Sequence, residues 1–318
     1  MPTINNNLQG DFAARTLNRM EKVLSSHVTD EQVLAFLHNT EFSYKKENKM
    51  LPIHRHRAEY EAYVDSKFQT LNRIKLDRMV SDYRRYKKNQ YLKITAANIL
   101  ESTILPKLQK FSRQDITGYH GLEHTELVAL RAVDIAISEG YTDTRPLMIT
   151  MLAAAVHDCA RTDNGYNTFH GPEAAKMPEV QRFLDSPEFN LTANEKQQIK
   201  NAAHNHTTAQ PYDGQKYDYV QKCLCDADRV RLSWQGKHEA KYFFTSYGNE
   251  LGKLSAYQAI DYLSDWDALY KKSGLQPLHG TFRHKYKICD GSHGHKVARF
   301  IEPNQRWTPQ NSYSTIRE

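Results

Sequence analysis

Residues 147–161 read LMITMLAAAVHDCAR, a nearly unbroken apolar run that closes on a histidine, an aspartate and an arginine. A helix at the surface of a domain shows a polar face along its length, and this run shows almost none before His157. It therefore predicts a helix over 146–159 that is buried at the centre of a domain.

The pair at the end of this run, His157 and Asp158, is costly to bury unless both side chains have a strong partner. A divalent cation is one such partner, because it accepts the imidazole lone pair and neutralises the carboxylate. For an isolated pair, a helix end at which the histidine bonds the aspartate and the aspartate bonds the backbone is the simpler explanation. The choice between the two depends on which other residues join the pair.

Helical spacing of apolar residues continues on both sides of the central run, and extended patterns are scarce, so we expect an all-α protein. Only residues 286–300 predict a β-hairpin, around Asp290-Gly291. The expected helices cover residues 12–26, 30–39, 58–107 in more than one piece, 119–138, 171–184, 194–205, 217–232 and 257–271. The expected domains are an N-terminal helical region (1–110), a helical catalytic core (111–273) and an irregular or hairpin extension (274–318).

The composition fits a chain that folds in water: 39% of its 318 residues are hydrophobic and 25% are charged. No apolar stretch resembles a signal peptide or reaches the length of a membrane span. Its four cysteines form no CxxC pair, which is more typical of reduced thiols than of a disulfide framework. We therefore expect a cytoplasmic protein, which a secretion system that reads other signals can still export.

The positive charge is concentrated in one tyrosine-rich region. Residues 42–93 hold 14 Lys/Arg against 6 Asp/Glu, whereas the whole chain carries a net charge of +6. Such a region could contact nucleic acid or acidic lipids, but a solvated helical face is the simpler explanation, because a charge excess alone carries little specificity.

Two other segments carry the residue types of the central pair. Residues 119–124 read YHGLEH, in which His120 and His124 are four apart and share a helix face. Residues 225–229 read CDADR inside another stretch with helical apolar spacing. Together with His157-Asp158, these segments resemble the HD phosphohydrolase superfamily, whose signature is His…His-Asp…Asp on successive helices of one bundle. The resemblance covers roughly residues 115–235.

The resemblance implies an HD-type helical bundle that binds one or two divalent metal ions (Mn, Mg, Fe, Ni or Zn). Matched residue by residue, it implies that the ligands are His124, His157, Asp158 and Asp228. Asp226 competes for the last place, but the family ligand stands directly before an arginine, which selects Asp228. Asp226 is then expected at the surface or in the outer sphere of the site. The implied reaction is hydrolysis of a phosphoester, nucleotide-like or ADP-ribose-like.

The resemblance also implies roles for residues around the metal. His120 corresponds to the proton donor of HD phosphodiesterases, and an imidazole that titrates near neutrality suits that task. The implied contacts to the phosphate or the rest of the substrate are Arg161, His170, Asn201 and His204. His206 is interpreted as a simple exposed histidine.

The YHGLEH and NAAH (201–204) segments also resemble the phosphodiesterase domains of SidE-type bacterial effectors, which cleave ADP-ribosylated ubiquitin. This narrower resemblance implies that His120, His204 and Glu173 are the catalytic groups, that no metal is needed, and that the protein is delivered into a host cell. Its implied partner is ubiquitin or another ADP-ribosylated protein.

Two other classes fit part of the sequence. Residues 120–124 match His-x-x-Glu-His, the inverted zincin element of some metallopeptidases, although Gly121 weakens the helix which that element requires. A non-enzyme with a degenerate HD site could instead use the basic region to hold a partner. The zincin interpretation leaves His157-Asp158 and the CDADR segment unexplained, so we expect an HD-type hydrolase.

Overall fold

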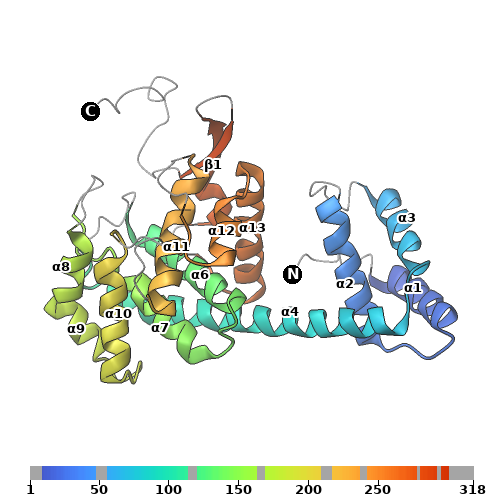
Figure 1. Cartoon of the computed structure of the whole chain (residues 1–318), viewed down its shortest axis with the longest axis horizontal. Helices are drawn as coiled ribbons and strands as arrows, with labels where there is room; N and C mark the ends of the chain where they lie inside the picture. Colours follow the sequence, from blue (N-terminus) through green and yellow to red (C-terminus); the bar gives the residue numbers. More distant parts are fainter. Residues whose placement is uncertain are drawn as a thin grey trace. The chain divides into compact units, whose positions relative to one another are not determined.

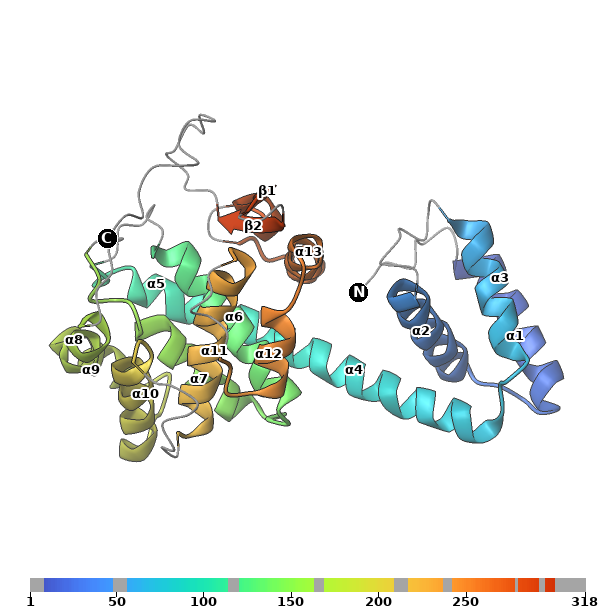
Figure 2. The same cartoon turned by 45° about the horizontal axis from the view of Figure 1, so that its top comes forward.

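The computed structural model describes residues 9–47, 56–113, 120–162, 169–208, 217–236, 242–277, 280–291 and 295–300. The chain divides into two compact units, residues 1–91 and 92–318 (Figures 1 and 2). Both are helical, and the described strands form one small hairpin, so the expectation of an all-α protein is confirmed. None of the helices in the described ranges is long and apolar enough to cross a membrane.

Unit 1 consists of α1 (Gln9–Leu24), α2 (Asp30–Glu47), α3 (Arg57–Phe68) and the first part of α4 (Arg73–Ile99). Its core joins side chains from all four helices: Met20, Phe36, Val64, Phe68 and Leu76 are among its buried members. Thr29 caps the start of α2, because its hydroxyl accepts from Gln32 N while the Gln32 side chain accepts from Thr29 N.

A π-turn, η2 (Leu100–Ile104), follows α4 and leads directly into α5 (Leu105–Leu108). Pro106 explains the change, because its ring lacks an N–H and would collide with the carbonyl four residues earlier in a regular α-helix. The expected helical stretch over 58–107 is thus present, in several pieces. The residue 110 boundary expected between the first two domains lies within unit 2, which begins at Leu92.

Unit 2 is built around α7 (Thr144–Val156), which contacts α6 (Leu122–Ser138), α10 (Ala193–Asn205) and α11 (Tyr219–Trp234). Nearly every α7 side chain from Leu147 onward is buried, so the predicted central helix is confirmed. It ends at Val156, three residues earlier than expected, and the next residues form a turn.

The region expected as one helix over 171–184 is two helices, α8 (His170–Lys176) and α9 (Pro178–Leu184). Met177 between them is extended (ψ 129°), the conformation that a following proline favours. The short helix α12 (Ser246–Gly252) was not predicted, whereas α13 (Ala256–Lys272) was.

The predicted hairpin is present as β1 (Tyr286–Asp290) paired antiparallel with β2 (Lys296–Phe300), after a 3₁₀ turn, η4 (Phe282–Lys285). Phe282, Ala298 and Phe300 belong to the same buried core as α7. The described part of the C-terminal extension therefore packs as a component of unit 2.

Candidate metal centre

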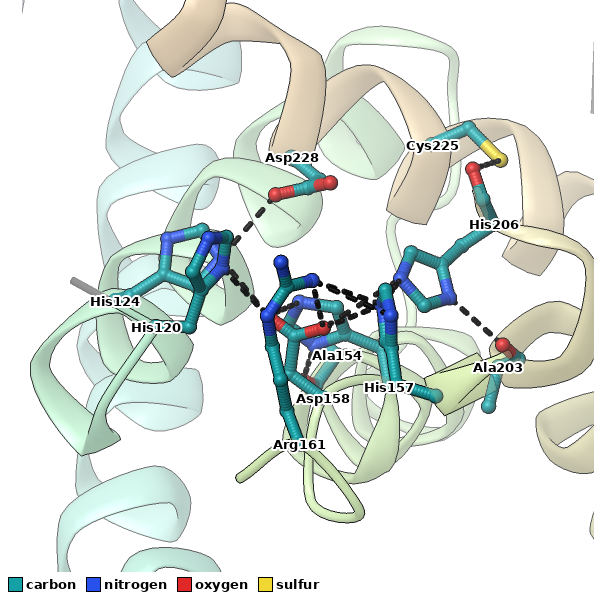
Figure 3. A network of polar contacts seen from close by, with 11 residues as sticks. His120, His124, Ala154, His157, Asp158, Arg161, Ala203, His206, Cys225 and Asp228 are labelled. Carbon is teal, nitrogen blue, oxygen red and sulfur yellow. Dashed lines mark hydrogen bonds and ion pairs between the residues drawn. The ribbon is translucent and has the colours of Figure 1, made fainter. Parts of the chain in front are cut away.

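Five segments of unit 2 bring histidines and aspartates to one buried point (Figure 3). The turn that follows α7 supplies His157 and Asp158, and the start of α6 supplies His124 with His120 just before it. Asp228 comes from α11. The remaining two histidines, His170 at the start of α8 and His206 directly after α10, complete the set, which we call the His/Asp cluster.

One carboxylate oxygen of Asp158, Oδ2, faces three histidines. It lies 3.0 Å from His120 Nδ1, 3.3 Å from His157 Nε2 and 3.6 Å from His124 Nε2. His124 Nε2 in turn lies 3.2 Å from Asp228 Oδ1. The four ligands expected from the sequence therefore meet, together with His120.

The other oxygen, Asp158 Oδ1, faces a second group. It lies 2.8 Å from His170 Nε2, 3.6 Å from His206 Nε2 and 3.8 Å from Arg161 NH1. Arg161 NH1 is also within 3.2 Å of His170 Nδ1. The interpretation of His206 as an exposed residue was wrong, since only 3% of it is accessible.

Backbone carbonyls fix the orientation of two of these imidazoles. His157 Nδ1 donates to Ala154 O at 2.6 Å, and His206 Nδ1 donates to Ala203 O at 2.7 Å. Since a carbonyl can only accept, Nδ1 of each ring carries a proton, and in the neutral form of the ring the lone pair on Nε2 faces the cluster. Metal-binding histidines are commonly held in this way.

Gly171 allows the His170 group to form. A β-carbon at this position would lie 2.5 Å from Ala203 O and 3.1 Å from His206 Nδ1. These distances are too short for a methyl group, so the close approach of α8 to the end of α10 requires glycine.

The donor set fits a metal ion. Ligand atoms of three overlapping groups lie within 4.8 Å of one another: His120/His124/Asp158, His124/His157/Asp228 and His157/Asp158/His206. Both His124 nitrogens, His157 Nε2 and Asp158 Oδ1 are buried and make no well-aligned hydrogen bond in the described ranges, although His170 Nε2 lies 2.8 Å from Asp158 Oδ1 and Asp228 Oδ1 lies 3.2 Å from His124 Nε2. Lone pairs that crowd together without bonding one another are expected where a cation takes their place. The buried His/Asp groups can therefore hold a metal ion.

The pKa shifts within the His/Asp cluster bear on whether its side chains are in the forms that bind a metal ion. Burial lowers the pKa of His120, His124 and His206, so these imidazoles are neutral at pH 7. Burial alone would raise the pKa of Asp158, but contact with the histidines holds it well below its usual value. His157 differs: burial opposes its charged form, but Asp158 raises its pKa above the usual value, so a metal ion would have to displace the proton of this ring.

Access to the cluster is confined to one side. The side chains of His120 and Asp228 are 17% and 24% exposed, whereas those of His124, His157 and Asp158 are at most 2% exposed. A substrate would therefore meet His120 and Asp228 before the other members.

Three residues proposed from the sequence lie outside the cluster. Glu173 on α8 and both Asn201 and His204 on α10 are exposed. Among the described contacts, Asn201 accepts from Gln197 Nε2, and none joins Glu173 or His204 to the cluster. The sequence contained the signal that His206 and not His204 faces inward, because Ile199, Ala202 and Ala203 on the buried side of α10 share its helical phase.

Asp226 stabilises the local fold. One of the two expectations placed it at the surface, and that expectation was wrong. It is fully buried, and its carboxylate accepts from Phe244 N at 2.8 Å and from Thr245 N and Oγ1 at 2.8 and 2.7 Å. Burial raises the pKa of Asp226 to about 6. Gly248 lies directly against this carboxylate, with no room for a β-carbon. Asp226 therefore fixes the segment that leads into α12.

Comparison with known proteins adds nothing to this description: no family model matches the chain, and neither a curated protein nor a solved structure matches it.

Proposed function

We propose that unit 2 is a metal-dependent phosphohydrolase or phosphodiesterase of the HD type. The observation that carries the proposal is the meeting of His124, His157-Asp158 and Asp228, from α6, the turn after α7 and α11, at a buried point with unbonded lone pairs. This is the order and helical setting of the HD signature. A divalent ion at such a site polarises a phosphoryl oxygen and lowers the pKa of water.

His120 is the group best placed to move a proton. Its Nδ1 lies 3.0 Å from Asp158 Oδ2, and because a carboxylate accepts, Nδ1 is the donor. This leaves Nε2 to exchange a proton with the substrate, on the accessible side of the cluster. Asp158 thereby orients the ring of His120, as carboxylates do for catalytic histidines.

Arg161 is the cation best placed to bind a phosphate oxygen within the cluster. Its side chain is only 8% exposed, and its guanidinium lies beside His170 and Asp158. A buried arginine in this position favours an anionic substrate, because the charge-assisted hydrogen bond is stronger away from water. His170, expected as a substrate contact, fits equally well as a metal ligand through Nε2.

Two other interpretations have less support. The SidE-like one, with ADP-ribosylated ubiquitin as substrate, needs Glu173 and His204 beside His120, and both are exposed on helices without a described contact to the cluster. The zincin one needs His120 on a helix with His124, but α6 begins at Leu122. A degenerate HD site in a binding module predicts a folded protein that holds no metal.

The test combines metal content with a substrate panel. The purified full chain is reconstituted with Mn, Mg, Ni or chelator and assayed on nucleotides, cyclic dinucleotides, simple aryl phosphates and ADP-ribosylated ubiquitin. We expect bound transition metal, metal-dependent turnover, and loss of both in His157→Ala, with the exposed His284→Ala as the matched control. Absence of transition metal after reconstitution would contradict the proposal, and turnover that resists chelation but is lost in His204→Ala would favour the SidE-like function.

A further inference from the structure

A cavity of about 530 Å³ lies in unit 2, where β2 passes the end of α11 and the start of α13. Figure 2 shows the hairpin beside α13. None of the described residues that line this cavity belongs to the His/Asp cluster, so it is separate from the candidate metal centre. Its volume falls within the range of small-molecule binding sites, about 300–1,000 Å³.

The hairpin gives the cavity a basic side. Arg299 and His295 both line it, both are exposed, and neither side chain has a partner among the described contacts. Lys296 also lines it but is paired with Asp290. None of the described residues that line the cavity is acidic. An anion in the cavity would therefore meet an arginine whose charge no carboxylate of the described ranges neutralises.

The geometry of β2 places Arg299 on the side of α11. Alternate side chains of a strand point to opposite faces, so Arg299 shares a face of β2 with Val297. Val297 contacts the end of α11, because a β-carbon at Gly236 would lie 3.2 Å from Val297 Cγ1. Arg299 therefore projects from the strand face that turns toward the end of α11, and the end of α11 forms another wall of the cavity.

The start of α13 adds backbone donors. Ser255 and Ala256 line the cavity, and Ser255 forms a capping box with Gln258. This box leaves the N–H groups of Ala256 and Tyr257 without an acceptor inside the helix. A helix terminus alone does not define a site, but this one borders the same cavity as Arg299. Amides at the start of a helix and a nearby guanidinium are groups that bind phosphate.

We propose that this cavity binds a phosphorylated small molecule of nucleotide size. The phosphates contact Arg299, His295 and the first amides of α13. The rest of the ligand lies against the apolar members of the lining, Trp234, Leu254 and Val297. This binding is independent of the chemistry proposed for the His/Asp cluster.

The experiment measures the binding of ADP to the full chain by isothermal titration calorimetry, with adenosine as the probe that lacks phosphate. Chelator is present throughout, so that no metal ion at the His/Asp cluster holds the phosphates. The variant at the cavity is Arg299→Gln, and the variant at the metal centre is Asp228→Asn. The matched control is Arg283→Gln, which removes the same charge from an exposed position outside the lining of the cavity.

We expect Arg299→Gln to bind ADP about tenfold more weakly than the natural chain, because a hydrogen bond to a charged group is lost. Arg283→Gln and Asp228→Asn should bind ADP like the natural chain, and adenosine should bind more weakly than ADP. Three results would each overturn the proposal: no binding of ADP up to about 1 mM, equal loss in Arg299→Gln and Arg283→Gln, or loss in Asp228→Asn alone, which would place ADP at the metal centre. If Arg299→Gln does not fold, His295→Asn serves the same test.

Discussion

His170 and His206 approach each other with their Nε2 atoms 3.0 Å apart, although 36 residues separate them in the chain. Because Nδ1 of His206 donates to Ala203 O, its Nε2 carries a lone pair that points toward His170 and Asp158. Asp158 thus has histidines at both of its oxygens. Asp158 would therefore help to hold a metal ion together with His124 and His157 or together with His206 and His170.

Replacing His206 by alanine should therefore reduce the bound metal without abolishing it. We expect the metal content of His206→Ala to fall by about one ion per chain where the natural protein holds two, because His124, His157 and Asp228 keep their own group. His204→Ala is the matched control, two residues away and exposed. Elemental analysis of both proteins decides the matter, and equal metal content in the two variants would refute the second position.

Replacing His120 by alanine should lower turnover but leave the metal in place. His120 pairs with Asp158 and lies against the ring of His124, and its side chain is the more exposed of these two histidines. Loss of a positioned proton-transfer group typically costs about 10²- to 10⁴-fold in rate. The measurement is kcat together with metal content, and a variant that loses its metal would show that His120 is a ligand.

Gly171→Ala should weaken both the fold and the metal centre. The new methyl group would meet Ala203 O and His206 Nδ1, so α8 must shift and carry His170 with it. Such overpacking costs about 1–3 kcal/mol. Urea unfolding and a metal titration follow the two effects, with the exposed Lys176→Ala on the same helix as the control. Unchanged metal affinity would mean that His170 is not needed for binding.

The Arg145–Glu195 pair should make stability depend on acid. The side-chain hydrogen bond with Arg145 lowers the pKa of Glu195 to about 2, from 4.5. A carboxylate whose pKa falls on folding stabilises the protein above its unfolded pKa, and this contribution disappears as the pH falls from about 5 to 2. Because the pair is partly solvated, we expect it to contribute about 1 kcal/mol at pH 7.

Glu195→Gln isolates this charge, since glutamine keeps the ability to accept from Thr192 N in the capping box. The free energy of unfolding of the variant should lie below that of the natural protein at pH 7 and equal it near pH 2. A constant difference at all pH values would mean that the ion pair is not the cause.

Much of the fold and part of the site could be predicted from local pattern. The apolar run before His157 specifies a central helix, and the resemblance to the HD signature selects His124, Asp158 and Asp228, which the structure brings together. The inward turn of His206 was missed although the helical phase of α10 indicates it. The short helix α12 could not be predicted from local pattern, because it depends on Asp226, whose partners lie 18 and 19 residues further along.

Asp226 and Asp228 are two residues apart, yet their replacement should affect different properties: the stability of the fold for Asp226 and the binding of metal for Asp228. Asp228→Asn removes a charged ligand from a site with 24% exposure, so metal should be lost while the fold changes little. Asp226→Asn leaves the cluster intact but places an amide where three donors converge, and a buried donor left unsatisfied costs about 1–3 kcal/mol. Metal analysis and urea unfolding of both variants should therefore show a stable Asp228→Asn protein without metal and a destabilised Asp226→Asn protein that retains its metal. If Asp226→Asn lost the metal and Asp228→Asn kept it, the ligand would be the first aspartate of the CDADR segment, and the HD alignment of α11 would be wrong.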